Sequence, residues 1–209
     1  MRPERRFVRA PELGFYFIVT DTKETEQNYF YGLRDSIPRE LQRRLVIKVA
    51  KTRTRNLLEE AQNLQAVHPQ YGEPWIVFDR DQVEDFDEII AAAEEKGIHV
   101  GWTNPCIEEW FAAYFGPMPP YRRSVECCGG FSRIFEMRTG QKYDKADPKI
   151  YEKLKRFGNE EAAIDTAEKK LMSFDREKDS RPSKMSPCTT VHRLVAEIRR
   201  KSNAAGAVS

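Results

Sequence analysis

Short apolar runs alternate along the first half of the chain with longer segments in which apolar residues recur every three or four positions. The short runs predict buried strands, and the helical spacing of the longer segments predicts amphipathic helices. We expect strands at residues 15–20, 45–50, 75–78 and 99–103, and helices at residues 25–36, 53–67 and 86–96. This alternation is typical of a parallel sheet covered by helices.

The pattern changes after residue 115, where Pro117, Pro119 and Pro120 interrupt the chain. Beyond them, helical spacing predicts helices at residues 125–137, 148–173 and 190–201, with a polar loop at 175–187. The expected fold class is therefore α/β, with a parallel sheet of about four strands flanked by helices and a helical C-terminal part. We divide the chain into a flexible N-terminus (1–12), an α/β core (13–115), a helical extension packed on the core (116–201) and a disordered tail (202–209).

Two acidic residues, Asp79 and Asp81, follow the apolar run at 75–78. Residues i and i+2 of a strand point the same way, so the two carboxylates should lie side by side. Like charges at such a distance repel unless a cation lies between them. Mg²⁺ binds through one or two carboxylates with water and substrate phosphates, and Mn²⁺ is expected to substitute for it. A turn in which aspartate caps the next helix would give the same pattern.

A second apolar run, at 15–19, also ends near acids. Asp21 follows it directly, and Glu26 lies in the first turns of the predicted helix after it. Ligands of open α/β sheets bind outside the carboxyl ends of the strands, so either acid could join Asp79 and Asp81 in one metal site. The helix dipole alone would also favour Glu26 at that position.

Further candidate residues follow the fourth predicted strand. Asn104 and Pro105 are suited to the N-cap and first turn of a helix, which would place Glu108 and Glu109 beside the same sheet edge. Either glutamate could point toward the ion or toward a base of the substrate. Asn104 could bind substrate as well, although capping alone would explain it.

Basic and aromatic residues supply candidates for substrate binding. Lys142 could hold a scissile phosphate, and Tyr143 could stack on a base, although a solvated loop has the same composition. Charged residues make up 33% of the chain, with a formal net charge of +2, but residues 39–55 are basic. Arg43 and Arg53 in that segment would contact a nucleic-acid backbone, unless it is an ordinary solvated face.

Several function classes are disfavoured by the sequence. The four cysteines have no zinc-site spacing, so we expect reduced thiols. The sequence shows no signal peptide and no apolar run of the roughly 20 residues that span a bilayer. This predicts a cytoplasmic protein with no membrane contact. A glycine-rich phosphate loop is missing too, so nucleotide hydrolysis by the chain itself is not expected.

Taken together, several segments resemble the RloB-like family. The matching segments are residues 19–30, 77–81, 103–110, 142–143, 150–151 and 189–194. The resemblance spans nearly the whole chain, and the combination of segments is specific although each alone is not. It implies a topoisomerase–primase (Toprim) catalytic fold in which the acids after the first strand and in the Asp79–Asp81 pair bind magnesium.

The resemblance also implies a function. Members of the RloB-like family are similar to nuclease effectors of bacterial anti-phage defence, and they often act with an ATPase encoded nearby. RNA, including transfer RNA, is the substrate this suggests, and DNA is an alternative. An oligomer is compatible with the sequence.

One departure from the family pattern concerns the first acid. The family usually has Glu-Gly where this chain has Asp21-Thr22. The aspartate carboxylate reaches roughly 1.5 Å less far. The ion could move closer, a water could fill the gap, or Glu26 could replace the missing ligand. A second hypothesis therefore stands beside the nuclease: a catalytically weak or inactive regulatory subunit of an ATPase-containing complex.

Overall fold

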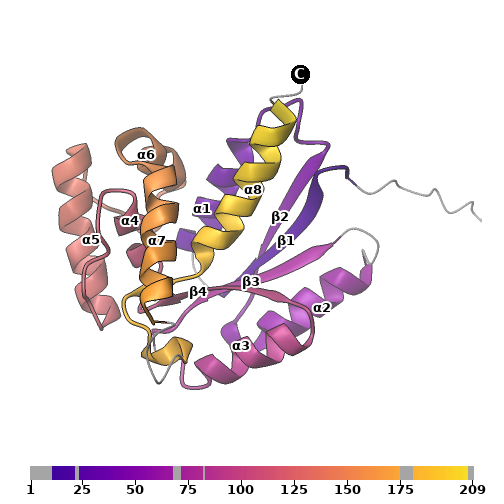
Figure 1. Cartoon of the computed structure of the whole chain (residues 1–209), viewed down its shortest axis with the longest axis horizontal. Helices are drawn as coiled ribbons and strands as arrows, with labels where there is room; N and C mark the ends of the chain where they lie inside the picture. Colours follow the sequence, from indigo (N-terminus) through magenta and orange to yellow (C-terminus); the bar gives the residue numbers. More distant parts are fainter. Residues whose placement is uncertain (1–10, 22–23, 68–71, 82, 175–180, 207–209) are drawn as a thin grey trace, which may run out of the picture.

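The computed structural model describes residues 11–21, 24–67, 72–81, 83–174 and 181–206 (Figure 1). Its centre is a five-stranded sheet in the order β2-β1-β3-β4-β5. Four strands are parallel to their neighbours: β1 (Gly14–Thr20), β2 (Leu45–Lys51), β3 (Glu73–Asp79) and β4 (His99–Asn104). The α/β fold class predicted from the sequence is confirmed, because all four predicted strands are present.

The fifth strand, β5 (Cys188–Thr189), pairs antiparallel with the end of β4 and was not predicted. Two residues are too few to give an apolar run or an alternating pattern. It lies between the polar loop predicted at 175–187 and the helix predicted at 190–201. The described part of that loop also contains a short 3₁₀ helix, η2 (Pro182–Lys184).

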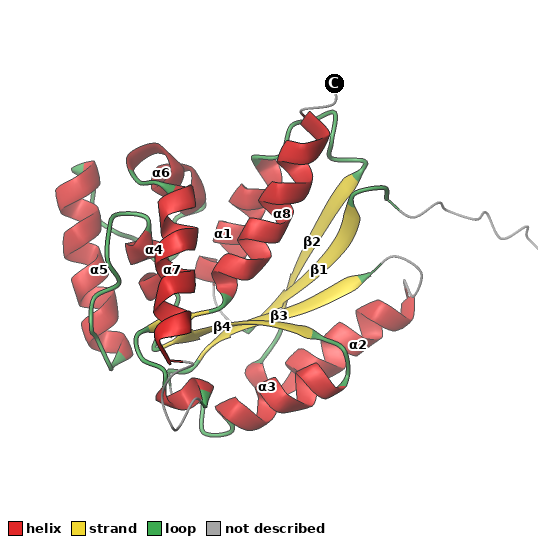
Figure 2. Ribbon diagram, viewed as in Figure 1, coloured by secondary structure: helices red, strands yellow, loops and turns green. Residues whose placement is uncertain are grey.

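Helices cover both faces of the sheet (Figure 2). On one face lie α1 (Glu24–Asp35) and α8 (Val191–Gly206), and on the other lie α2 (Leu57–Val67) and α3 (Phe86–Glu95). Alternate side chains of β1 divide between the two faces, since Ile18 joins the core under α1 and α8 while Val19 joins the core over α2 and α3. This period of two explains why the strands, buried on both sides, read as continuous apolar runs.

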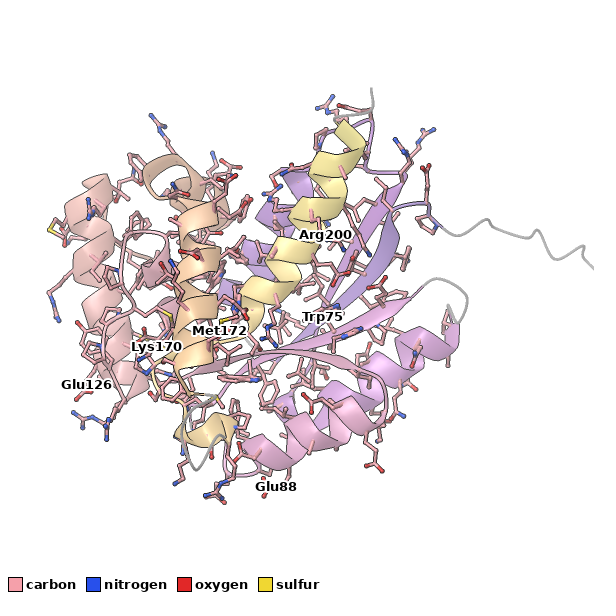
Figure 3. The ribbon with its side chains drawn as sticks, viewed as in Figure 1. Trp75, Glu88, Glu126, Lys170, Met172 and Arg200 are labelled. Carbon is pink, nitrogen blue, oxygen red and sulfur yellow. The ribbon has the colours of Figure 1, made fainter. Side chains whose placement is uncertain are left out.

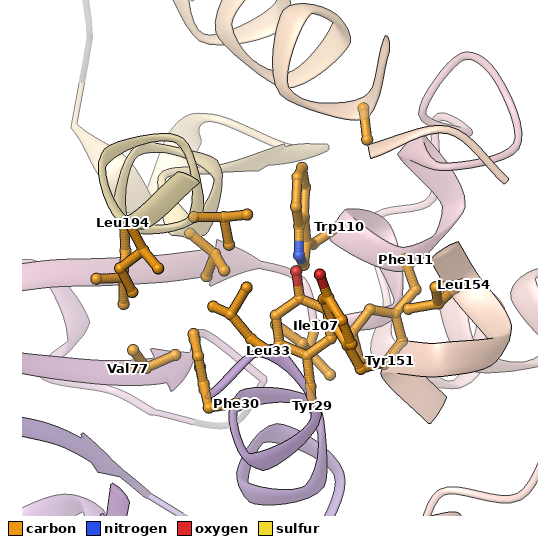
Figure 4. Packing of buried hydrophobic residues seen from close by; sticks show 14 of the residues in the cluster. Tyr29, Phe30, Leu33, Val77, Ile107, Trp110, Phe111, Tyr151, Leu154 and Leu194 are labelled. Carbon is orange, nitrogen blue, oxygen red and sulfur yellow. The ribbon is translucent and has the colours of Figure 1, made fainter. Parts of the chain in front are cut away.

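Four further helices gather at one side of the sheet: α4 (Glu108–Ala113), α5 (Ser124–Thr139), α6 (Ile150–Phe157) and α7 (Glu160–Phe174). They do not have a separate core. Trp110 of α4 and Tyr151 of α6 belong to the same buried cluster as Tyr29 and Phe30 of α1 (Figure 4). The helical C-terminal part therefore packs on the sheet domain through one continuous set of apolar contacts.

Two predicted helix boundaries differ from the structure. The single helix predicted at 148–173 is two helices, α6 and α7, separated at Gly158 and Asn159. The Asn159 side-chain oxygen accepts a hydrogen bond from the Ala162 N–H at 3.0 Å, which caps α7. At the other end, α8 continues to Gly206 and buries Ser202, so residues 202–206 are helical where a disordered tail was expected.

No helix in the described ranges is long and apolar enough to cross a bilayer.

Candidate metal centre

The carboxyl ends of the parallel strands form one edge of the sheet, and a cavity of about 320 Å³ lies beside it. Asp79 is the last residue of β3, Glu26 is in the first turn of α1 after β1, and Glu108 is the first residue of α4 after β4. All three side chains line the cavity, together with the exposed Asp81. The sequence-based expectation that acids from separate strand ends come together at this edge agrees with this placement.

Asp79 is held in place by the chain that follows β4. Its Oδ2 accepts a hydrogen bond from the Ile107 backbone N–H at 3.0 Å. The loss of surrounding water raises the pKa of Asp79 well above its ordinary value, and the negative charge of Glu26 raises it further. Asp21 and Glu108 add to this effect. The negative charges of three other acids therefore act on the carboxyl group of Asp79.

Glu26 is buried, with 4% of its surface exposed. Burial raises its pKa to about 8, with the charge of Asp21 as the next contribution and a hydrogen bond with Asp79 acting in the opposite direction. A carboxyl with this pKa holds a proton at neutral pH when no cation is bound. The cluster thus needs either protons or a bound cation to balance its charge.

Asp21, the acid that departs from the family pattern, is also buried. Its backbone N–H donates to the Val77 carbonyl at 3.2 Å, which continues the β1–β3 ladder and fixes its position. Its Oδ2 accepts a hydrogen bond from the Thr54 hydroxyl at 3.1 Å. One carboxylate oxygen of Asp21 is therefore already bound by η1 (Thr54–Asn56), the 3₁₀ helix after β2. Thr22, the other half of the departure, lies outside the described residues.

Asp79 and Asp81 do not share a strand face as the spacing predicted. The strand ends at Asp79, and Asp81 has a φ of +24°, so the alternation of an extended chain does not reach it. Its carboxylate instead accepts a hydrogen bond from the Ser124 hydroxyl at 2.6 Å, at the start of α5. Asp81 still lines the cavity, but on its exposed side.

The two glutamates after β4 have different surroundings. Glu108 is buried, and its Oε1 accepts a hydrogen bond from the Tyr143 hydroxyl at 3.1 Å and lies 3.2 Å from the Lys145 ammonium group. Glu109 is fully buried beside the Cys127 thiol, and it is not among the residues that line the cavity. Burial raises the pKa of Glu109 to about 8. Only Glu108 faces the site.

Asn104 does not cap the following helix, because α4 begins four residues later, at Glu108. Its amide donates to the backbone carbonyls of Pro182 and Ser183 at 3.0 and 3.2 Å. Asn104 thus binds the η2 segment to the end of β4. Sequence spacing missed this role because the partner lies 78 residues further along the chain.

The candidate basic residues are spread around the molecule. Arg43 precedes β2 and so lies at the amino edge of the sheet, opposite the cavity, whereas Arg53 follows β2 at the carboxyl edge and is exposed. Lys142 is exposed and is not among the cavity-lining residues, but Lys145 is. The sequence indicated the right segment, because Lys145 lies three residues after Lys142, yet a loop has no periodicity that would select between them.

Tyr143 is half-buried, and its ring packs edge-on against Phe131 with centroids 4.7 Å apart. Phe135 lies at 5.8 Å. Because its ring packs in this aromatic cluster and its hydroxyl donates to Glu108, Tyr143 helps to hold Glu108 in position at the cavity. Stacking on a substrate base, as expected from the sequence, would require it to leave these contacts.

The donor set suits a hard divalent cation, because the acids at the cavity offer carboxylate oxygens from three directions. A protein-family model for RloB-like proteins matches residues 16–198, from within β1 to the middle of α8. This chain belongs to the RloB-like protein family. The acidic cavity and the helical part of this RloB-like chain both lie inside the matched region. Searches of curated proteins and of solved structures found no match.

Proposed function

We propose that this RloB-like chain is a Mg²⁺-dependent phosphodiesterase that cleaves nucleic acid in bacterial anti-phage defence. The observation that supports it best is the convergence of four acids, Asp21, Glu26, Asp79 and Glu108, at the carboxyl edge of a parallel sheet. The close approach of these acids is favourable only when a cation or bound protons offset their mutual repulsion. RNA such as transfer RNA is the substrate class suggested by the family, with DNA as the alternative.

The residues at the cavity have distinct roles in this proposal. Asp79 and Glu26 would hold the ion, with Asp21 or Asp81 completing the site through one oxygen or a water. A bound Mg²⁺ supplies an activated water and stabilises charge on the phosphodiester. Lys145, beside Glu108, is placed to contact a phosphate, and Arg53 at the same edge would bind the nucleic-acid backbone.

The decisive experiment compares Asp79→Asn with the wild-type protein in Mg²⁺-dependent cleavage of RNA and DNA. Asparagine keeps the size of the side chain and its oxygen acceptor for Ile107 but removes the charge. Loss of a direct ligand should reduce the rate by more than the about 10- to 100-fold typical of an outer-shell partner. Binding of Mn²⁺, measured by electron paramagnetic resonance, should weaken in parallel.

A matched control is Glu88→Gln, which changes the same charge on the outer surface of α3 (Figure 3). It should cleave at the wild-type rate. An Asp79→Asn protein that also cleaves at the wild-type rate, or cleavage that persists in excess chelator, would refute the proposal.

A second candidate function is a catalytically weak or inactive adaptor subunit of an ATPase-containing defence complex. The hydrogen bond from Thr54 to Asp21 favours it, because it engages one oxygen of the shorter acid. Two apolar side chains of α5, Val125 and Met137, are 85% and 75% exposed and could contact such a partner. Substitution of both by aspartate should then abolish phage defence in cells that also carry the ATPase, while Asp79→Asn leaves defence intact. The nuclease proposal expects Asp79→Asn to abolish it.

A further inference from the structure

Three of the four cysteines lie together beside the acidic cavity: Cys106 lines it, and Cys127 and Cys128 of α5 are hydrogen-bonded with Cys106. The sulfur of Cys106, in the chain between β4 and α4, lies 3.9 Å from that of Cys128 in α5. The ligand atoms of Cys106, Cys128 and Glu108 all lie within 4.8 Å of one another. These three donor atoms are close enough to share one ion.

Sequence spacing gave no indication of this group. Cys106 and Cys128 are separated along the chain by α4 and by the proline-containing segment that follows it, and they come together because α5 packs on α4. Cys127 and Cys128 are adjacent in α5, where successive side chains point in directions about 100° apart. Cys127 is also hydrogen-bonded with Cys106, but its thiol lies beside Glu109 and is not part of the group of three donor atoms.

We propose that Cys106, Cys128 and Glu108 form a binding site for one thiophilic divalent ion of the zinc class. A tetrahedral zinc with Zn–S bonds of about 2.3 Å places two thiolate sulfurs about 3.8 Å apart. The two sulfurs of this chain are separated by 3.9 Å before any ion is added. The Glu108 carboxylate supplies a third ligand, and the fourth position is directed to water in the cavity that Cys106 and Glu108 line.

A cation already lies beside these groups. The Lys145 ammonium group is 3.2 Å from Glu108 Oε1 and is hydrogen-bonded to the Cys128 sulfur. Its side chain is 60% exposed, so it can turn into solvent when an ion takes its place. Lys145 and the ion therefore compete for the same two groups, and loss of the lysine charge should strengthen metal binding.

Binding has a defined proton balance. Cys106 and Cys128 each release a thiol proton to the solvent, and the two thiolates with the Glu108 carboxylate give three negative charges against two positive ones. The site goes beyond the proposed function and does not depend on it, because binding is measurable without nucleic acid. Since Glu108 belongs to both, an ion at the thiols would withdraw this carboxylate from the magnesium-binding acids.

The test is a Co²⁺ titration of the reduced, metal-free, full-length protein. We expect a thiolate-to-cobalt charge-transfer absorption that saturates at one ion per chain and is lost on addition of Zn²⁺. Cys128→Ser should weaken Co²⁺ binding at least about 10-fold, because it removes a direct ligand. Cys188→Ala changes a thiol in the core on the other face of the sheet and should leave the titration unchanged.

A second pair of variants tests the competition. Lys145→Gln should bind Co²⁺ more tightly than the wild type, and Lys142→Gln, three residues away and outside the cavity, should not. Absence of the charge-transfer band in the reduced wild type, or a full band in Cys128→Ser, would overturn the proposal. Loss of the band in Cys127→Ser would overturn the ligand set. Asp79→Asn should keep the band, which separates this site from the magnesium site if either one fails.

Discussion

The buried carboxyl of Glu26 shows at the scale of one residue how the acids at the cavity affect one another. Its pKa is raised to about 8, chiefly by burial and then by Asp21. In the unfolded chain the same group ionises near its ordinary value of 4.5. Between these two values the folded protein holds a proton that the unfolded chain has released, so stability falls as pH rises through this window.

The first prediction concerns this pH dependence. In metal-free buffer, the free energy of unfolding of the wild type should decline between about pH 4.5 and pH 8. Glu26→Gln removes the ionisable group, so its decline should be smaller and it should exceed the wild type in stability at pH 8. Urea denaturation at several pH values measures both, with Glu88→Gln as the control that follows the wild type. An unchanged slope in Glu26→Gln would show that burial of this carboxyl carries no such penalty.

Residue types alone predicted much of the acidic cluster. Asp21, Glu26, Asp79 and Glu108 were found from the rule that strand ends meet at one sheet edge, and the structure places all four there. Lys145 and the paired thiols were not found. Lys145 and Cys128 come from the helical part, and the contacts that bring them to Glu108 and Cys106 are tertiary, so no local sequence pattern predicts them.

At the scale of secondary-structure elements, the break between α6 and α7 depends on Gly158. A Cβ atom at this position would lie 2.7 Å from the Tyr114 carbonyl oxygen and 2.8 Å from the Tyr114 Cβ. The neighbouring Asn159 N–H donates to that same carbonyl at 2.9 Å. The helical spacing continues on both sides of the break, which is why the sequence predicted one helix. The signal that was available is the Gly-Asn pair, a combination that favours a turn.

A second prediction tests this close approach. Gly158→Ala should lower the free energy of unfolding by about 1–3 kcal/mol, because backbone atoms must move to admit the methyl group. The matched control is Gly129→Ala within α5, where the nearest atom to a Cβ is the end of Arg133 at 3.9 Å. That variant should be up to about 1 kcal/mol more stable than the wild type, since alanine favours a helix. Equal stability of the two variants would contradict the packing described for Gly158.

For the molecule as a whole, the sheet edge and the helical part build one site together. The sheet contributes Asp21 and Asp79, while α4 and the segment before α6 contribute Glu108 and Lys145. The single buried cluster that joins Tyr29 to Trp110 and Tyr151 holds these parts in register. A cation bound at the edge should therefore stabilise the entire chain against unfolding.

The last prediction measures that linkage. An ion that binds only the folded protein at 100 times its dissociation constant adds about 2.7 kcal/mol to the free energy of unfolding, so Mg²⁺ or Mn²⁺ should raise the melting temperature. The rise should be larger at pH 8 than at pH 6, because the proton held by Glu26 competes with the ion below its pKa of about 8. Asp79→Asn should lose most of the rise, and Glu88→Gln should keep it at the same ionic strength. An equal rise in Asp79→Asn would place the stabilising ion elsewhere on the molecule and remove the main support for a magnesium site at this edge.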